Sequence, residues 1–268
     1  MLSSPRTLKF WYSPLLLMVL CAFSLVTSPL VSFASEDGNL VLALDIDGTI
    51  NPAVVDYLDS GFTKAQDNGA YFIIVQMNTP GGLDTAMRDI IKTILDSNIP
   101  VVTYVSPDGA RAASAGTYIL YASHIAAMAP ATNLGAATPI QIGGLKGFEG
   151  DRVEQQEDDN LSGKTALERK IINDASAYIK ALASKHGRNG DWAVKAVREA
   201  VSLTANEALE LDVINIVAED VNDLLRQLNG REITIKGKTI WLATESVRVE
   251  SLEQSWRYKL LGVISDPT

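Results

Sequence analysis

The sequence predicts an α/β protein with a largely parallel sheet flanked by helices. Short apolar runs alternate along the chain with segments of helical periodicity, an order that favours βαβ units joined by right-handed crossovers. The runs are almost continuously apolar, which is typical of parallel strands covered on both faces. With 268 residues, 47% hydrophobic and 21% charged, the composition is that of a globular chain of one or two domains.

The first 34 residues have the three parts of a secretory signal peptide. Arg6 and Lys9 form a basic start, an apolar run follows over residues 15–26, and Ala34 ends the segment. An uncleaved membrane anchor is the alternative, because the apolar run is short for a spanning helix but could be prolonged. Cys21 is the only cysteine and lies in this run, so the remaining chain offers neither a disulfide nor a thiolate metal site.

Beyond this leader the chain is acidic. It carries 21 Lys and Arg against 32 Asp and Glu, a net formal charge of −11. Binding of nucleic acid needs a basic surface, so nucleic acid is not expected as a partner. We expect a main domain over residues 35–230 and a tail over residues 231–268, and the sequence indicates no cofactor.

In the N-terminal half, each element is predicted from its own pattern. Asn51 is a good N-cap and Pro52 suits the first helical position, so a helix is expected over residues 51–66. Periodicity predicts further helices over residues 83–97 and 112–122. The apolar runs predict strands over residues 40–46, 71–77, 100–105 and 124–128.

The C-terminal half begins with a change of character. Residues 141–164 are rich in glycine and acidic side chains and are expected to form a mobile loop. A helix then starts near Thr165, and the capping box from Thr204 to Glu207 opens a shorter one. A strand (213–217), a helix (221–228), a hairpin (232–242) and an amphipathic helix (252–264) complete the expected order.

Two short motifs could carry chemistry. The first, Asn78-Thr79-Pro80-Gly81-Gly82, follows the second strand, where paired glycines let the backbone approach a ligand and leave amides free at a helix start. Such amides can form an oxyanion hole, although a tight strand-to-helix turn explains the same residues. The second motif places Ser114 among small residues, close to a Gly-x-Ser-x-Gly elbow in which Ala112 replaces the first glycine. A helix packed tightly through alanine is the alternative.

A nucleophilic serine needs a base, and the chain has only two histidines. His124 lies between apolar residues of a strand and is expected in the core. His186 lies at a polar helix end and is expected to be solvated, and its use in a Ser-acid-His order has no local support. Lysine can replace histidine in a Ser–Lys pair when its surroundings are apolar. No Ser-x-x-Lys occurs, so such a lysine must come from elsewhere in the chain.

The stretch "LDIDGTI" offers a competing interpretation. Asp45 and Asp47 are spaced like the nucleophile loop of haloacid-dehalogenase-type phosphatases. That chemistry needs further acidic side chains and a lysine at later strand ends, and the next strand end is "NTPGG". The residues that a phosphatase would need at this strand end are therefore missing.

Together these motifs resemble a known family. "NTPGG", "ARAASAGTYI" and "HIAAMAPATNLGAATPI" are similar in residues and order to the NfeD-type membrane-bound serine proteases, which have the ClpP/crotonase fold. The similarity continues through "KIINDASAYIKALASKHGRN" and spans roughly residues 40–267. It implies a fold of repeated β-β-α and βαβ units with a largely parallel sheet. The turn after the first strand also matches the family in Gly48, Ile50 and Pro52. This match implies that Asp45 and Asp47 are turn and edge residues and that Pro52 opens the first helix.

The resemblance also implies residue roles. Ser114 matches the nucleophile, and Lys170 matches the catalytic lysine. The amides of Gly82 and Ala115 match the oxyanion hole, and Gly81 and Gly116 lie beside them as substrate-binding positions. Because the acidic loop before Lys170 is long, Lys164 and Lys146 remain alternative bases.

The implied protein is an exported, membrane-associated endopeptidase without metal or cofactor, on the extracytoplasmic side of the membrane. Its expected substrates are apolar segments of membrane proteins such as stomatin-like partners, and a homodimer or larger homo-oligomer is expected. Two other functions stay open: a catalytically silent binding or scaffold module of the same fold, and a crotonase-type acyl-CoA enzyme.

Overall fold

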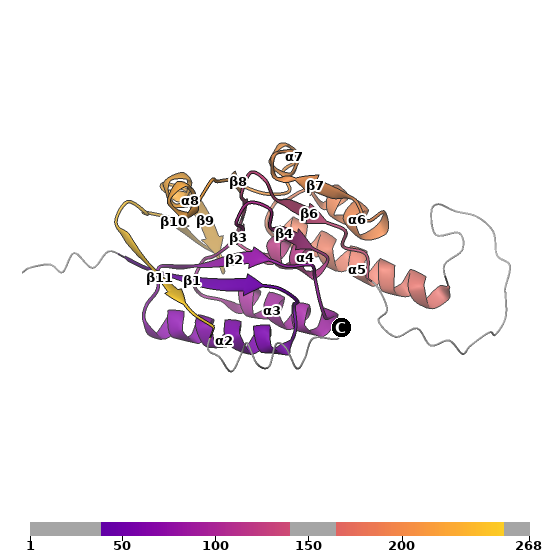
Figure 1. The fold of residues 1–268 in the computed structure, drawn as a ribbon, viewed down its shortest axis with the longest axis horizontal. Helices are drawn as coiled ribbons and strands as arrows, with labels where there is room; N and C mark the ends of the chain where they lie inside the picture. The colour runs from indigo at the N-terminus through magenta and orange to yellow at the C-terminus, as the bar shows by residue number, and fades with distance from the viewer. Residues whose placement is uncertain (1–38, 140–164, 255–268) are drawn as a thin grey trace, which may run out of the picture. The chain divides into compact units, whose positions relative to one another are not determined.

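The computed structural model describes residues 39–139 and 165–254 (Figure 1). The strands are β1 (Asn39–Asp47), β2 (Phe72–Asn78), β3 (Val101–Val105), β4 (Arg111–Ala113), β5 (Ile125–Met128), β6 (Asn133–Gly135), β7 (Ser202–Thr204), β8 (Ile216–Val217), β9 (Glu232–Ile235), β10 (Lys238–Trp241) and β11 (Val247–Leu252). The helices are α2 (Pro52–Asp67), α3 (Asp84–Asp96), α4 (Ala115–Ala122), α5 (Ala166–Lys185), α6 (Gly190–Arg198), α7 (Ala205–Glu210) and α8 (Val221–Leu228).

A six-stranded parallel sheet forms the centre, in the order β11-β1-β2-β3-β5-β8. One face packs against α2 to α6, and the other packs against α8 and the β9–β10 hairpin (Figure 1). Successive strand residues alternate between the two cores, as Ile73 and Ile74 do in β2. A smaller sheet, β4-β6-β7, lies beyond the carboxyl end of β3.

Local sequence signals fix several helix starts. Asn51 accepts a hydrogen bond from the amide of Val54, and Pro52 occupies the first turn of α2. Thr165 and Glu168 form a capping box at the start of α5. Thr204 and Glu207 form the capping box predicted for α7.

The structure differs from the sequence-based expectation in three places. Residues 111–113 form β4, so the helix expected from residue 112 begins only at Ala115. The elements β6, β7 and α6 were not anticipated. Leu252 was expected to open a helix but is the last residue of β11, which pairs in parallel with β1.

The remaining expected strands, helices and hairpin are confirmed within a few residues. The expected acidic loop lies outside the described residues. Of the expected amphipathic helix beyond Leu252, only Glu253 and Gln254 are described. Within residues 39–139 and 165–254, no helix combines the length and hydrophobicity needed to cross a membrane.

Candidate active site

Ser114 occupies a sharp turn between β4 and α4. Its backbone angles, φ 52° and ψ −115°, lie outside the regions that non-glycine residues normally adopt. Such conformations cost on the order of 1–3 kcal/mol and occur mainly where the surrounding structure enforces them. The order of strand, strained serine and helix is that of a nucleophile elbow, and the Ser114 side chain is only half-buried.

The two sequence motifs meet at this turn. A Cβ atom added to Gly81 would lie 2.7 Å from the Cβ of Ser114 and 3.2 Å from its Oγ. Gly81 also has a positive φ of 114°, so both its conformation and its contact with Ser114 require glycine. A Cβ on Gly116 would come within 2.6 Å of the Thr79 methyl group. The first turn of α4 therefore also packs closely against the first motif.

Within residues 39–139 and 165–254, two backbone amides near Ser114 find no acceptor. The amide of Ser114 donates to Gly135 O, and that of Leu83 donates to Ile50 O. Among the residues that the structure describes, the amides of Gly82 and Ala115 donate to no protein group. Because Ala115 is the first residue of α4, its amide also lies at the positive end of the helix dipole. Both amides are thus available to an oxyanion next to Ser114.

Lys170 lies at the Ser114 end of the neighbouring helix. Tyr118 of α4 and Tyr178 of α5 stack with ring centroids 6.2 Å apart. Beyond α5, Arg188 donates to the carbonyl of Tyr121 near the C-terminal end of α4. The two helices therefore run side by side in the same direction, which places Lys170, two turns before Tyr178, toward Ser114.

The structure does not complete a Ser–Lys pair. Lys170 is exposed, and within the described part of the chain its side chain makes no hydrogen bond or ion pair, nor does the Ser114 hydroxyl. The apolar surroundings expected for a base are therefore not formed by the described residues. Lys146 and Lys164, the alternative bases, lie outside them.

An arginine links the helix that bears Lys170 to the helix that follows Gly82. Arg88 of α3 forms ion pairs with Asp84 at 2.9 Å and with Asp174 of α5 at 2.7 Å. Its guanidinium also lies 4.5 Å from the ring centroid of Tyr178. Since Asp174 is four residues after Lys170, this cluster fixes the turn of α5 next to the proposed base.

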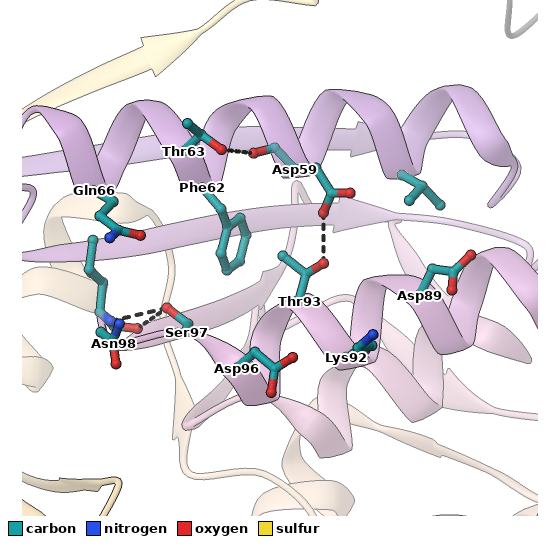
Figure 2. A pocket seen from close by; sticks show the side chains of 12 residues that line it. Asp59, Phe62, Thr63, Gln66, Asp89, Lys92, Thr93, Asp96, Ser97 and Asn98 are labelled. Atoms are coloured by element: carbon teal, nitrogen blue, oxygen red, sulfur yellow. Dashed lines mark hydrogen bonds between the residues drawn. The ribbon is translucent and has the colours of Figure 1, made fainter.

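A separate groove is lined by residues of α2, α3 and the turn that follows α3. It has a volume of about 590 Å³ and runs between α2 and α3 (Figure 2). Asp59 of α2 accepts a hydrogen bond from Thr93 across it. Its α3 residues, from Asp89 to Asp96, belong to the part of the helix remote from Gly82. We assign no chemistry to this groove.

The two histidines pack against each other rather than near Ser114. Their rings lie edge to face with centroids 5.6 Å apart, at the C-terminal end of α4. The Nδ1 atom of His124 accepts a hydrogen bond from the amide of Val101, as a core histidine should. The prediction that His186 is solvated was wrong, because the tertiary contact with His124 and Arg188 covers much of its ring.

This histidine pair predicts acid sensitivity. Burial, and then the charge of Arg188, lowers the pKa of His124 to about 4 and that of His186 to about 3. At a pH between these values and the ordinary histidine pKa of about 6.5, the unfolded chain binds more protons than the folded one. Stability is therefore fully present above about pH 6.5 and falls as the pH decreases toward 4, by on the order of 3 kcal/mol for each histidine.

Urea unfolding at pH 7, 6, 5 and 4 measures this loss, and His186→Gln is the matched variant. It removes one ionisable ring whose Nε2 has no hydrogen-bond partner among the described residues. We expect the variant to lose less stability than the wild type over this range. An equal loss in both proteins would contradict a role for the histidine pair.

Asp45 and Asp47 have structural partners. The amide groups of Gln76 and Asn78 in β2 donate to the carboxylates of Asp45 and Asp47, respectively. Partial burial and the charge of Asp47 raise the pKa of Asp45, and the bond from Gln76 opposes this shift. Both aspartates end β1 beyond the last pair with β11, which agrees with their interpretation as edge residues.

Comparison with known proteins shows close relatives. A family model for the N-terminal domain of NfeD1b matches residues 40–238. The membrane-bound protease PH1510 of Pyrococcus horikoshii is 40% identical over 231 residues, 85% of this chain and 49% of that protein. Membrane protein NfeD1b of Bacillus subtilis is 37% identical over 108 residues, 40% of this chain and 24% of its own length. The chain thus spans half or less of these curated relatives.

Solved structures give the same result. A 1510-N membrane-bound stomatin-specific protease, as a lysine-to-alanine mutant with a substrate peptide, aligns with a TM-score of 0.74 at 38% identity, over 85% of this chain and 99% of that one. A serine-to-alanine mutant aligns with a TM-score of 0.70 at 39% identity, over 81% and 99% of the two chains. The ClpP-like fold expected from the sequence is therefore confirmed.

Proposed function

We propose that this chain, which belongs to the NfeD1b N-terminal domain family, is a serine endopeptidase. In this proposal Ser114 is the nucleophile and Lys170 is the base. The observation that carries the proposal is the strained Ser114 turn, in contact with Gly81 and beside the amides of Gly82 and Ala115. The names of two solved relatives describe a serine-to-alanine mutant and a lysine-to-alanine mutant, the latter with a bound substrate peptide. These names support a Ser–Lys reaction.

In this mechanism the Ser114 hydroxyl oxygen attacks the carbonyl carbon of a peptide bond. Its proton passes to the neutral amine of Lys170, and the new oxyanion accepts hydrogen bonds from Gly82 N and Ala115 N. The C–N bond then breaks as the lysine returns the proton to the leaving amine. Water hydrolyses the acyl-enzyme by the same route and frees Ser114. Gly81 and Gly116 keep the backbone close to the reacting carbonyl.

We extend the proposal to substrate and location. One relative is named as stomatin-specific and membrane-bound, so an apolar segment of a stomatin-like membrane protein is the substrate that we propose. Residues 1–34 would serve as an export signal or anchor, which places the domain on the extracytoplasmic side. We place the protease domain at residues 35–230. Strand β11, from the segment 231–268, pairs with β1 and so adds a strand to its sheet. Assembly into a homodimer or larger oligomer is also part of the proposal.

A silent peptide-binding module is the second candidate. The exposure of Lys170, and the absence of a described bond between it and Ser114, favour this reading. Both candidates predict binding of an apolar peptide, but only the protease cleaves it.

The test is incubation of the purified chain with apolar peptides from a stomatin-like protein, followed by mass spectrometry of the products. A serine-reactive phosphonate should prevent cleavage. Binding without cleavage would support the silent module and overturn the proposal.

Arg88→Ala tests how α5 is held. Loss of two exposed ion pairs and the contact with Tyr178 should cost only about 1 kcal/mol of stability. We expect peptide cleavage to fall about tenfold, because a small displacement of the base has a large effect on rate. Arg226→Ala, which removes the Arg226–Asp223 ion pair on α8, is the control and should retain full activity. Equal activities in the two variants would show that the Arg88 cluster does not position Lys170.

A further inference from the structure

The side chain of Thr117 forms a hydrogen-bonded centre beneath Ser114. Its hydroxyl lies 2.8 Å from Ala112 O and 3.0 Å from Gly135 O, the two carbonyls to which it can donate. The same oxygen accepts a hydrogen bond of 3.1 Å from the amide of Gly135. Thr117 is fully buried, so no solvent can replace these bonds.

These bonds hold the chain on both sides of the serine. Ala112 precedes Ser114 by two residues in β4, and Gly135 ends β6, the parallel partner of β4. Gly135 O also accepts a hydrogen bond of 2.9 Å from the amide of Ser114, and the amide of Thr117 donates to Ser114 O. Thr117 therefore joins the strand before the turn, the strand beside it and the helix after it.

Gly135 is packed tightly against the backbone that leads into β7. Its φ is 130°, and an added Cβ would come within 2.3 Å of Val201 O. Val201 directly precedes β7, the antiparallel partner of β6, so the backbone beside β6 leaves no room for a side chain at Gly135. A carbonyl held in this way is a fixed acceptor for the amide of Ser114.

We propose that Thr117 is a positioning residue that holds Ser114 in its strained conformation, with the hydroxyl directed toward the oxyanion amides. This inference rests on the proposed function. Without the Thr117 hydroxyl, the buried amide of Gly135 and the carbonyl of Ala112 each lose a partner. The turn can then relax toward ordinary backbone angles, which moves the nucleophile away from the amides of Gly82 and Ala115.

The experiment compares Thr117→Val, Thr117→Ser and Thr103→Val in peptide cleavage and phosphonate labelling. Valine keeps the shape of threonine without its hydroxyl, and serine keeps the hydroxyl. Thr103 is the matched control, because it is also fully buried and its hydroxyl bonds to Ser123, beyond the opposite end of α4. Thr103→Val measures the cost in stability of losing a buried hydroxyl far from Ser114.

We expect kcat to fall about 10²-fold in Thr117→Val, with KM nearly unchanged and labelling of Ser114 slowed in parallel. Thr117→Ser and Thr103→Val should stay within about threefold of wild type. A normal kcat in Thr117→Val, or an equal loss in Thr103→Val, would overturn the proposal.

If Thr117→Val does not fold, Thr117→Cys decides, since a thiol is a weaker hydrogen-bonding group than a hydroxyl. A kcat below that of Thr117→Ser supports the inference, and an equal kcat overturns it. Failure of the proposed function gives a different result, because the wild type itself would then neither cleave peptide nor label at Ser114.

Discussion

Replacing Ser114 by alanine is expected to reduce peptide cleavage at least about 10³-fold, because in the proposed mechanism its hydroxyl forms the acyl bond and no second nucleophile is proposed. The fold should be unaffected, since alanine meets the same backbone strain at φ 52°. Ser114→Gly should be equally inactive but more stable by about 1 kcal/mol, because glycine adopts positive φ at little cost.

Steady-state rates and thermal melting of the two variants test this pair of expectations. Ser184→Ala is the control, since Ser184 lies exposed on α5 and bonds only to the carbonyl of Lys180. It should match the wild type in both measurements. Activity retained in Ser114→Ala would remove the serine from the mechanism, and a less stable Ser114→Gly would show that the turn is not strained.

Replacing Gly82 by alanine is expected to lower kcat by about 10²–10³. An added Cβ would come within 2.1 Å of Ile50 O and 2.6 Å of Ile50 N. Both atoms form hydrogen bonds that hold this strand end: Leu83 N donates to Ile50 O, and Ile50 N donates to Gly81 O. The backbone must therefore shift, and the amide of Gly82 shifts with it. Stability should also fall, because these contacts are backbone atoms that cannot rotate away.

Gly190→Ala separates this effect from a general cost of replacing glycine. A Cβ at Gly190 would make only ordinary contacts of 3.6 and 3.7 Å with Lys180 and Ala183. We expect it to retain normal kcat and stability. Rates are compared below the melting temperature of Gly82→Ala, so that the folded enzyme is measured. A normal kcat for folded Gly82→Ala would exclude this amide from the oxyanion hole.

The sequence predicts those parts of the fold that carry local signals. Asn51 and Pro52 mark the start of α2, and the capping boxes at Thr165 and Thr204 mark α5 and α7. By contrast, β4, β6 and β7 have three residues each, too few for a period to be recognised. Strand β11 alternates charged with apolar residues and is defined by its pairing with β1, a contact of long sequence separation.

The candidate site also contains residues that the sequence reveals and residues that only the structure reveals. Ser114 and the glycines were recognisable because small residues cluster at two strand ends, and the structure brings these motifs together. Thr117 was missed, since a threonine near a helix start is unremarkable until Gly135 is placed beside it. His186 was misassigned for a similar reason: its burial depends on His124, which is distant in sequence.

The most direct test of the account is the rate and site of labelling by a serine-reactive phosphonate, followed by peptide mapping. Wild type, Ser114→Ala and Lys170→Ala are compared, with Lys180→Ala as a control on the exposed side of the same helix. We predict one adduct, on Ser114, that is absent in Ser114→Ala, slowed at least about 10²-fold in Lys170→Ala, and unchanged in Lys180→Ala. An adduct on another residue, or equal labelling of Ser114 in Lys170→Ala, would contradict the Ser114–Lys170 dyad.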